Sequence, residues 1–461
     1  MSTNTISHVG DLNDEQALSF FGTDGIRGKS QTFLTNSLVS QIGYWCNHVL
    51  LGEGPILIGQ DSRASSERIA SALAHGLATK NREIWLLGLC PTPAVSHLIK
   101  KYNASGGLMI SASHNPPEDN GIKIFDKTGE KISLEKQIFI DNKLKRKVLI
   151  PICKDKDNCI NRNDLLKDYK NSLLNTVDKE SLIDIPIVLD LCWGSASSCG
   201  EKLFKALGAN VISINAIPDG EKINVNCGST HLEHIKKVVL ESNAQMGFAF
   251  DGDADRMIAI DGKGRVIDGD HSLYLWGSSL QDKNMLPEQR LVTTVMSNLG
   301  LEKAWLNRGG KLTRTPVGDQ HVHKAMLTNK ASLGGEQSGH ILSTLNDLCG
   351  DGLLAAIQLS SICNRKGILL SEWRDQSFKP YPQKLISVPI AKHITQNYLN
   401  KSEKFRLSIA EAELDLGKEG RVFIRKSGTE PLVRVMVESI DKLLVESLTT
   451  KIAKIALEEF N

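Results

Sequence analysis

A short apolar strand runs into a polar turn in Gly106-Gly107-Leu108-Met109-Ile110-Ser111-Ala112-Ser113-His114-Asn115-Pro116-Pro117. Residues 108–110 suit a buried strand, and the Asn-Pro-Pro at the end cannot continue one. Ser113 at this break, with His114 beside it, is well placed to present its hydroxyl outward. The other interpretation is an ordinary strand-ending turn in which Ser113 is a local cap. A metal site and phosphate-binding groups elsewhere in the chain favour a chemical role for the hydroxyl.

Strands and helices alternate on both sides of this segment. Upstream, strand-like runs at 55–58 and 83–87 alternate with helical patterns at 38–49 and 65–78. Downstream, the alternation resumes near residue 185 and continues to about residue 375. This pattern predicts α/β architecture with mixed, largely parallel sheets.

The 461 residues are too many for one core, and the sequence predicts four domains. A Lys-, Asp- and Asn-rich segment at about 149–170 predicts a linker and an interdomain helix. Beyond about residue 380, three predicted strands and a closing helix at 443–457 indicate a smaller α+β domain. We expect three α/β domains, carrying the Ser113 loop, a metal-binding loop and a sugar-binding loop, and then the α+β domain, with boundaries at 1–160, 161–270, 271–378 and 379–461.

Composition excludes several classes of protein. The 55 basic and 53 acidic residues give a net charge of +2, so we expect no bulk attraction to nucleic acid or to a membrane surface. The first 18 residues are polar, and no run of about 18 apolar residues occurs, so neither a signal peptide nor a membrane span is expected. Nine scattered cysteines without a Cys-x-x-Cys suit reduced thiols in a cytoplasm.

Asp251-Gly252-Asp253-Ala254-Asp255 follows a predicted strand at 245–250. Three carboxylates crowded at a strand end repel one another unless a cation lies among them, and hard oxygen ligands suit Mg²⁺. A solvated acidic turn is the alternative. An EF-hand is excluded because the glycine stands at the second position rather than the sixth, and Gly262 stands at the twelfth.

Two further polar loops follow along the chain. Residues 335–340, Gly-Glu-Gln-Ser-Gly-His, come after a third predicted α/β unit. Because ligands of such sheets bind beyond the carboxyl ends of the strands, we expect this loop, the Ser113 loop and the Asp251 loop to face one site. Residues 425–434, Arg-Lys-Ser-Gly-Thr-Glu-Pro-Leu-Val-Arg, offer charge and small donors that could cradle a phosphate, or they form an exposed basic turn. The spacing of a nucleotide-hydrolysing P-loop is absent.

Taken together, these stretches resemble the α-D-phosphohexomutases, and within them most closely the bacterial phosphoglucosamine mutases. The resemblance extends from Phe21 to about Glu438. Four motifs occur in the family's order, which is far more specific than any one of them: residues 21–28 (Phe-Gly-Thr-Asp-Gly-Ile-Arg-Gly), 110–116, 334–340 and 425–431. The segment 190–194 departs from the family by lacking its usual Asn-Gly-Ala, which we expect to affect packing rather than chemistry.

The resemblance implies a heart-shaped four-domain isomerase that interconverts glucosamine 6-phosphate and glucosamine 1-phosphate on the route to UDP-N-acetylglucosamine and peptidoglycan. It implies Mg²⁺, priming by glucosamine or glucose 1,6-bisphosphate, a sugar phosphate as the binding partner, and a cytoplasmic monomer or homodimer. Phosphomannomutases and phosphoglucomutases share the chemistry and remain alternatives. A metal-dependent phosphatase is disfavoured because one aspartate cluster supplies a single metal site. A non-catalytic sugar-phosphate sensor would have no need of Ser113, Lys123 and the three aspartates together.

The resemblance also assigns roles to the matching positions. Ser113 corresponds to the phosphoserine that carries the transferable group and whose oxygen completes the metal site. The remaining metal ligands match Asp251, Asp253 and Asp255. Residues placed for proton transfer and charge stabilisation match Lys123, His340 and Arg27. The substrate contacts match Arg256, Gly318, Glu336 and Ser338, and the clamp on the non-transferring phosphate matches Arg425, Ser427, Gly428, Thr429 and Arg434.

Overall fold

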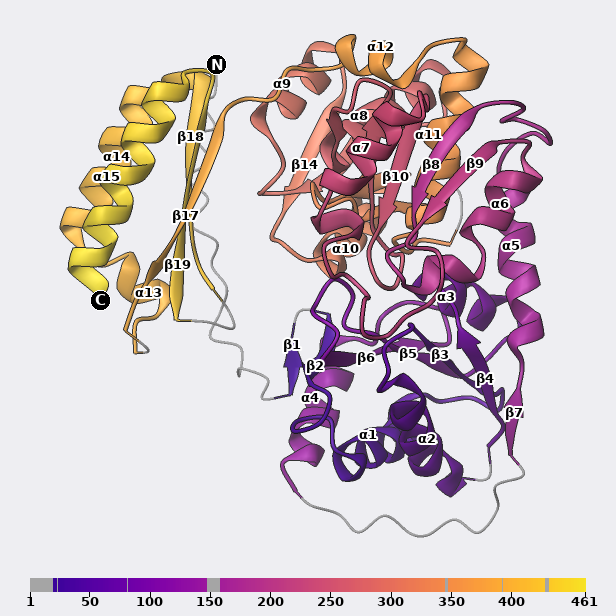
Figure 1. Cartoon of the computed structure of the whole chain (residues 1–461). Helices are drawn as coiled ribbons and strands as arrows, with labels where there is room; N and C mark the ends of the chain where they lie inside the picture. Colours follow the sequence, from indigo (N-terminus) through magenta and orange to yellow (C-terminus); the bar gives the residue numbers. More distant parts are fainter. Residues whose placement is uncertain are drawn as a thin grey trace. The chain divides into compact units, whose positions relative to one another are not determined.

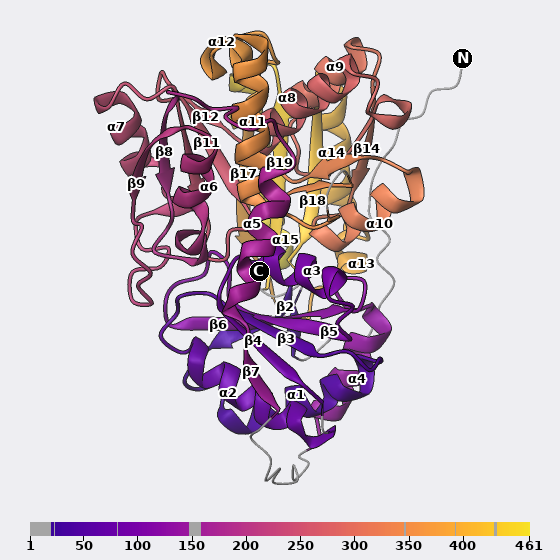
Figure 2. The ribbon, with the colours of Figure 1, turned by 90° about the vertical axis from the view of Figure 1, so that its right-hand side faces the viewer.

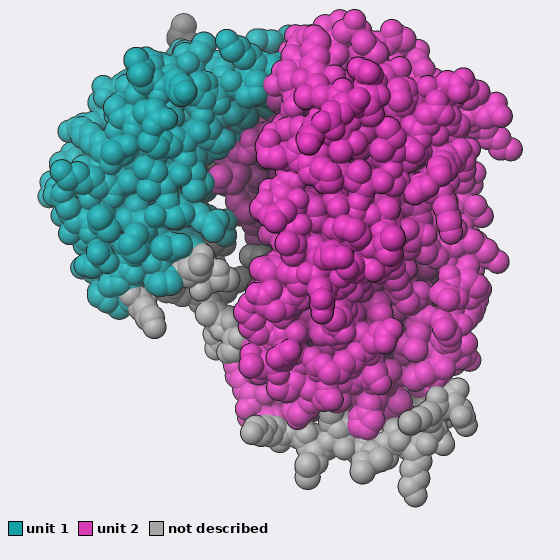
Figure 3. All heavy atoms as spheres, viewed as in Figure 1, with its two compact units in different colours: residues 1–17, 297–308, 378–461 teal, residues 18–296, 309–377 magenta. Residues whose placement is uncertain are grey.

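The computed structural model describes residues 20–22, 24–80, 82–146, 158–344, 347–391, 393–427 and 431–461. The chain forms two compact units (Figure 3). The larger unit contains residues 18–296 and 309–377, and the smaller unit contains residues 297–308 and 378–461. No helix among the described residues is both long and apolar enough to cross a bilayer.

The larger unit is built on three sheets (Figure 1). The first has the order β1 (Phe21–Gly22), β2 (Gly25–Lys29), β6 (Asp119–Asp126), β5 (Gly106–Ile110), β3 (Ile56–Gln60), β4 (Ile84–Leu89), β7 (Cys159–Asn161). The second has the order β12 (Val266–Ile267), β11 (Met257–Asp261), β10 (Met246–Phe250), β8 (Pro186–Asp190), β9 (Asn210–Ile214). The third has the order β14 (Lys311–Thr315), β13 (Arg290–Thr294), β15 (Leu333–Gly335), β16 (Ile341–Ser343).

In all three sheets, parallel strands at the centre are followed by an antiparallel strand. Strands β5, β10 and β15 run parallel to their central neighbours β3, β8 and β13. Each then enters a polar loop and returns as an antiparallel partner, β6, β11 or β16. The predicted α/β class with mixed sheets is confirmed. The three polar loops singled out in the sequence are therefore equivalent connections of three similar sheets.

Helices cover these sheets and supply the core. In the larger unit they are α1 (Asn36–Val49), α2 (Ser66–Leu77), α3 (Thr92–Lys101), α4 (Leu134–Leu144), α5 (Leu166–Leu174), α6 (Gly200–Ala206), α7 (Glu233–Glu241), α8 (Gly269–Asp282), α10 (Asp319–Asn329), α11 (Gly352–Lys366) and α12 (Leu370–Asp375). Figure 2 shows α1 and α2 side by side against the first sheet. They approach closely because Gly76 has no side chain: a Cβ there would lie 2.0 Å from the carbonyl oxygen of Ser40.

The segment at about 149–170, predicted as a linker and an interdomain helix, contains a short strand and the start of a helix. Residues 147–157 lie outside the described part of the chain. Beyond them β7 pairs in parallel with β4 and extends the first sheet, which the polar composition of the segment concealed. The predicted interdomain helix is α5, whose Tyr169 and Leu173 are buried.

The smaller unit contains an antiparallel sheet of order β17 (Gln383–Pro389), β19 (Leu432–Ser439), β18 (Gly420–Lys426). Helices α14 (Glu403–Leu416) and α15 (Lys442–Phe460) pack against it, and their apolar faces meet Val433, Val435 and Val437 in one core. The unit also includes α9 (Leu299–Asn307) and α13 (Gln396–Leu399). The smaller α+β domain is confirmed, whereas α14 was not predicted.

Candidate active site

Ser113 lies in the loop between β5 and β6, and its backbone is left-handed, with φ of 53°. This conformation is uncommon for a residue with a side chain and indicates a local constraint. The serine is 1% exposed, and its Oγ donates a hydrogen bond of 2.6 Å to Oδ2 of Asp251. The hydroxyl is therefore directed onto a carboxylate of the next sheet, not outward as the sequence suggested.

Arg63 holds this loop in place. Its guanidinium is fully buried, pairs with Asp61 at 2.9 Å and donates to the carbonyl oxygens of Ser113 (2.9 Å) and Asn115 (2.8 Å). It also donates to the carbonyls of Pro116 and Asp119. Five fixed donors make arginine suited to this kind of bracing. Sequence reasoning missed Arg63, although its place just after β3, at the same sheet edge as Ser113, was a usable signal.

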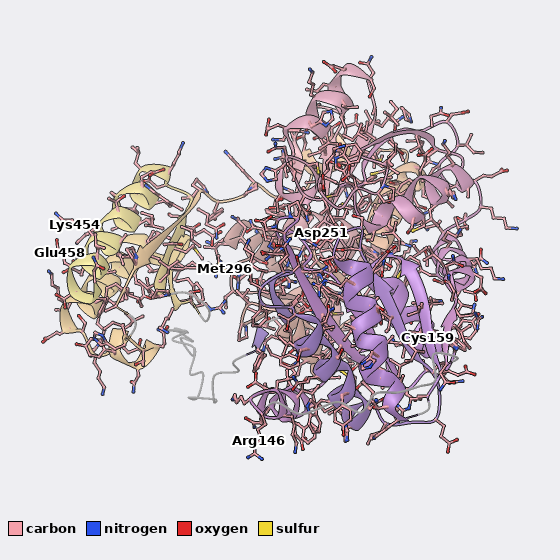
Figure 4. The ribbon with its side chains drawn as sticks, turned by 60° about the horizontal axis from the view of Figure 1, so that its bottom comes forward. Arg146, Cys159, Asp251, Met296, Lys454 and Glu458 are labelled. Carbon is pink, nitrogen blue, oxygen red and sulfur yellow. The ribbon has the colours of Figure 1, made fainter. Side chains whose placement is uncertain are left out.

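Asp251, Asp253 and Asp255 occupy the turn between β10 and β11; Asp251 is labelled in Figure 4. All three are buried, and one oxygen of each lies within 4.8 Å of the others. Burial, together with the charges of Asp255 and Asp253, raises the pKa of Asp251 well above its usual value. The buried Oδ1 of Asp253 has no hydrogen-bond partner among the described residues. An unsatisfied oxygen among crowded carboxylates fits a divalent cation, so these residues can hold a metal.

Lys123 supplies positive charge to the same cluster. It projects from β6, where it stands opposite Met109 of β5, and is 1% exposed. Its Nζ lies 2.7 Å from a carboxylate oxygen of both Asp253 and Asp255. Burial alone would lower the pKa of Lys123, but the carboxylates of Asp24, Asp253 and Asp255 outweigh it and raise the pKa well above its usual value. The ammonium group therefore stays charged.

A second layer of charges connects this cluster to the third sheet. His340 lies between Asp255 and Asp319, with its ring nitrogens 3.6 and 3.7 Å from their carboxylates. Burial alone would lower the pKa of His340, but Asp255 and Asp319 raise it above its usual value. Lys131 forms ion pairs with both Asp24 and Asp319. Asp24, Lys131 and Asp319 were not among the predicted site residues.

Arg27 and Arg256 both contact the segment that contains Ser113. Arg27 forms an ion pair with Asp24 and donates to the carbonyl of Ala112 at 3.3 Å. Nη1 of Arg256 lies 3.3 Å from Nδ1 of His114. Burial and the charges of Arg256 and Arg27 lower the pKa of His114 to about 4, so this imidazole is neutral at pH 7. The positive charge here belongs to the two arginines.

The third predicted loop follows β15. Oε1 of Glu336 accepts a hydrogen bond of 3.1 Å from the backbone nitrogen of Gly318. Gly318 has φ of 126°, a conformation that favours glycine. The backbone nitrogen of Glu336 donates to the carbonyl of His340 at 3.0 Å, and this hydrogen bond closes the turn. Ser338 is exposed at the tip of the turn.

The predicted phosphate loop lies in the smaller unit, at the end of the β18–β19 hairpin. Arg425 of β18 stands directly opposite Arg434 of β19. The backbone nitrogen of Ser427 donates to the carbonyl of Leu432 at 2.8 Å and closes the strand pair before the turn. Gly428 and Thr429 lie outside the described residues. Like charges directly across a strand pair destabilise it unless an anion compensates them.

Sequence models of one family match nearly the whole chain. They describe the phosphoglucomutase/phosphomannomutase alpha/beta/alpha domains I, II and III, at residues 19–148, 167–264 and 268–381, and the C-terminal domain at residues 385–455. The chain belongs to the phosphoglucomutase/phosphomannomutase family. The predicted enzyme class, an isomerase that acts as an intramolecular phosphotransferase, is thereby confirmed.

Curated members of the family include close relatives of this chain. The phosphoglucosamine mutase of Prochlorococcus marinus (strain MIT 9313) is 53% identical over 449 residues, which are 96% of both chains. That of Synechococcus sp. (strain CC9311) is 53% identical over 457 residues, 97% of this chain and 98% of the relative. These relatives confirm the resemblance to phosphoglucosamine mutases.

Solved family structures share the fold. A phosphoglucomutase/phosphomannomutase family protein from Burkholderia thailandensis has a TM-score of 0.79 at 20% identity, covering 97% of this chain and 99% of its own. The N-acetylphosphoglucosamine mutase of Aspergillus fumigatus, in complex with GlcNAc-6P and magnesium, has a TM-score of 0.68 at 18% identity, covering 96% of each chain. Another structure of the fungal enzyme, with alanine replacing a serine, holds glucose 1,6-bisphosphate.

Proposed function

We propose that this chain is a phosphoglucosamine mutase, which interconverts glucosamine 6-phosphate and glucosamine 1-phosphate through a phosphorylated Ser113 and a bisphosphate intermediate. The observation that carries the proposal is the 2.6 Å contact between Oγ of Ser113 and Asp251, inside a buried acidic cluster. A chain 53% identical to curated phosphoglucosamine mutases over 96% of its length supports the choice of substrate.

Phosphoryl transfer requires neutralised charge and aligned oxygens more than covalent assistance. Ser113 carries the phosphoryl group, and the bracing of its loop by Arg63 fixes the direction of its Oγ. Asp251, Asp253 and Asp255 would hold Mg²⁺ together with an oxygen of the phosphorylated serine. When bound, Mg²⁺ supplies charge neutralisation at the phosphoryl oxygens.

Cationic side chains complete the charge balance around the transferring group. Lys123 keeps its positive charge in this environment, and the pKa of His340 is raised by Asp255 and Asp319, so both side chains can stabilise developing negative charge and donate a proton to a leaving oxygen. Arg27 and Arg256 present guanidinium groups beside Ser113, and each has a buried Nε without a hydrogen-bond partner among the described residues. Those free donors suit the extra anionic oxygens that a phosphorylated Ser113 brings.

The remaining residues bind the sugar and its second phosphate. Glu336 and Ser338 contact sugar hydroxyls, and Gly318 orients Glu336 through its backbone nitrogen. The non-transferring phosphate is held by Arg425, Ser427, Gly428, Thr429 and Arg434. The position of Arg425 directly opposite Arg434 across the hairpin supports this assignment, because it brings two guanidinium groups to one place and such groups suit a phosphate. The bisphosphate turns over between the two transfers, so this loop holds either end of it.

The proposal includes the physiological setting. Glucosamine or glucose 1,6-bisphosphate primes the enzyme by phosphorylating Ser113. The product supplies UDP-N-acetylglucosamine and peptidoglycan synthesis in the cytoplasm. The enzyme acts as a monomer or homodimer, without nucleic acid or membrane partners.

Substrate comparison tests the proposal. The kcat/KM values for glucosamine, glucose and mannose 6-phosphates, each primed with the matching bisphosphate, should be highest for glucosamine, with residual activity on glucose. Glu336 and Ser338 meet hydroxyls that glucose and glucosamine share, so the preference has to come from other contacts. A roughly tenfold advantage for glucose or mannose phosphate would make the chain a phosphoglucomutase or phosphomannomutase instead.

A further inference from the structure

Two buried thiols meet at the side of the second sheet nearest the Ser113 loop. Cys192 follows β8, and Cys227 precedes the short turn at residues 228–230. Their Sγ atoms lie 3.9 Å apart, and both residues are almost completely buried. They are 35 residues apart in the chain, so the fold rather than local sequence brings them together. Cys192 lies in the segment that departs from the family pattern.

One carboxylate holds both cysteine segments. Oδ1 of Asp190 accepts from the backbone nitrogen of Cys192 at 3.0 Å, and Oδ2 accepts from the backbone nitrogen of Gly228 at 2.8 Å. Gly228 lies so close that a Cβ there would be 2.4 Å from Sγ of Cys192. Cys192 and Trp193 are both left-handed, with φ of 59° and 53°. The backbone is thus constrained to keep the two thiols in contact.

Asn224 connects this thiol pair to Ser113. Sγ of Cys192 donates to Oδ1 of Asn224 at 3.1 Å. The amide Nδ2 of Asn224 in turn donates to the carbonyl oxygens of Ser113 at 2.9 Å and Asn115 at 3.0 Å. The Cys192 thiol therefore orients an amide that supports the backbone of the Ser113 loop. Asn224 acts as a positioning residue in this arrangement.

We propose that Cys192 and Cys227 form a reversible disulfide, and that this disulfide slows phosphoryl transfer at Ser113. A disulfide places its sulfur atoms about 2.05 Å apart. Closure from 3.9 Å therefore needs a movement of at least one of the two cysteine side chains. Oxidation removes the S–H that Asn224 accepts, so the amide loses its orientation toward the Ser113 loop. The effect on turnover, but not the disulfide itself, rests on the proposed function.

A linear disulfide such as oxidised glutathione serves as the oxidant for this step. One cysteine loses its proton and attacks a sulfur of the oxidant, which breaks the S–S bond and forms a mixed disulfide. The first thiol of the oxidant leaves in this step, and the second cysteine then attacks the mixed disulfide and displaces the other thiol. Two electrons and two protons pass to the oxidant, and one S–S bond forms in the protein. Because the thiols are buried, local opening precedes attack, and the exposed Cys159 reacts first.

The test uses the full chain, equilibrated with oxidised glutathione or with reduced dithiothreitol. Each sample is then quenched in acid, unfolded, alkylated and mapped by peptide mass. The oxidised sample should contain a peptide that links Cys192 to Cys227. Its mutase activity should fall on the order of tenfold, as expected for loss of one orienting hydrogen bond, and should return on reduction. Cys227→Ala should keep its activity in both conditions, and Cys159→Ala should respond as the wild type does.

A second variant tests the link between the thiol pair and the Ser113 loop through Asn224. Asn224→Asp keeps the oxygen that faces Cys192 but loses the amide that supports Ser113. The reduced variant should show lower kcat with nearly unchanged KM, and oxidation should add little further loss. Three results would overturn the proposal. The first is the absence of a Cys192–Cys227 link in the oxidised sample, and the second is a link that leaves the activity unchanged. The third is a loss of activity on oxidation of Cys227→Ala that equals the loss in the wild type. A reduced wild type without any mutase activity would refute the proposed function, while peptide mapping would still decide the disulfide.

Discussion

The cluster around Ser113 and the hairpin that carries Arg425 are built in opposite ways. In the cluster, buried carboxylates and cations alternate, and the donors of Lys123 and the Oγ of Ser113 already have acceptors. In the hairpin, two like charges stand opposite each other on a partly exposed strand pair. A preorganised, balanced site suits chemistry at one fixed atom. A surplus of positive charge suits capture of an anionic group that has to bind and leave.

The largest expected effect comes from removing the group that accepts the phosphoryl. Ser113→Ala should reduce mutase turnover to background, because no other side chain can carry the transferred group. The fold should persist, since Ser113 contributes its loop contacts mainly through its carbonyl. Intact mass should show one phosphoryl group on the primed wild type and none on the variant. Ser361→Ala, a buried serine within α11, is the matched control. Turnover by Ser113→Ala at the wild-type rate would contradict the proposed mechanism.

Charge balance in the cluster is tested by Lys123→Met. Leaving buried acids without their cation should cost about 3–5 kcal/mol of unfolding free energy and abolish activity. Because Mg²⁺ would then provide the missing positive charge, its addition should stabilise this variant more than it stabilises the wild type. Urea unfolding with and without Mg²⁺ measures the difference. Equal stabilisation of both proteins would show that Lys123 and the ion do not share these carboxylates.

The proposed metal ligands are tested by Asp253→Asn. Metal affinity and activity should fall together. Loss of a residue that only supports a metal ligand costs roughly 10- to 100-fold in metal affinity or activity, and loss of a ligand itself should cost at least as much. Zn²⁺ should replace Mg²⁺ poorly, because the cluster offers neither Cys nor His as a ligand. Activity after chelation and graded return of Mg²⁺ checks both statements. Asp375→Asn, on an exposed ion pair with Arg265, is the control. An enzyme that is indifferent to the chelator would argue against the metal site.

Local sequence patterns predicted much of this site, and their limits are physical. Ser113 and the three aspartates stand out because strand-ending turns and carboxylate spacing are features of neighbouring residues. Lys131 meets partners 107 and 188 residues away, and no local spacing reveals such pairs. The same limit applies to β7, a strand of three residues that is recognised by its pairing with β4. The antiparallel direction of β6, β11 and β16 also depends on pairing between strands, so it could not be predicted from the sequence. The apolar runs that form strands could be recognised.

The smallest expected effect concerns the hairpin of the smaller unit. Arg425→Ala should remove a charge-assisted contact to the non-transferring phosphate, which is worth about 1.5–3 kcal/mol, or on the order of tenfold to a hundredfold in kcat/KM. The loss should appear in the kinetics, and urea unfolding should show that the variant remains folded. Arg425→Lys should recover only part of the kinetic loss, because lysine keeps the charge but loses the forked geometry. Lys384→Ala, a cation of β17 paired with Glu446, controls for the charge of the sheet. Unchanged kinetics of Arg425→Ala with the monophosphate substrate would show that this hairpin is not the clamp, and the contrast between the two regions would then concern the fold alone.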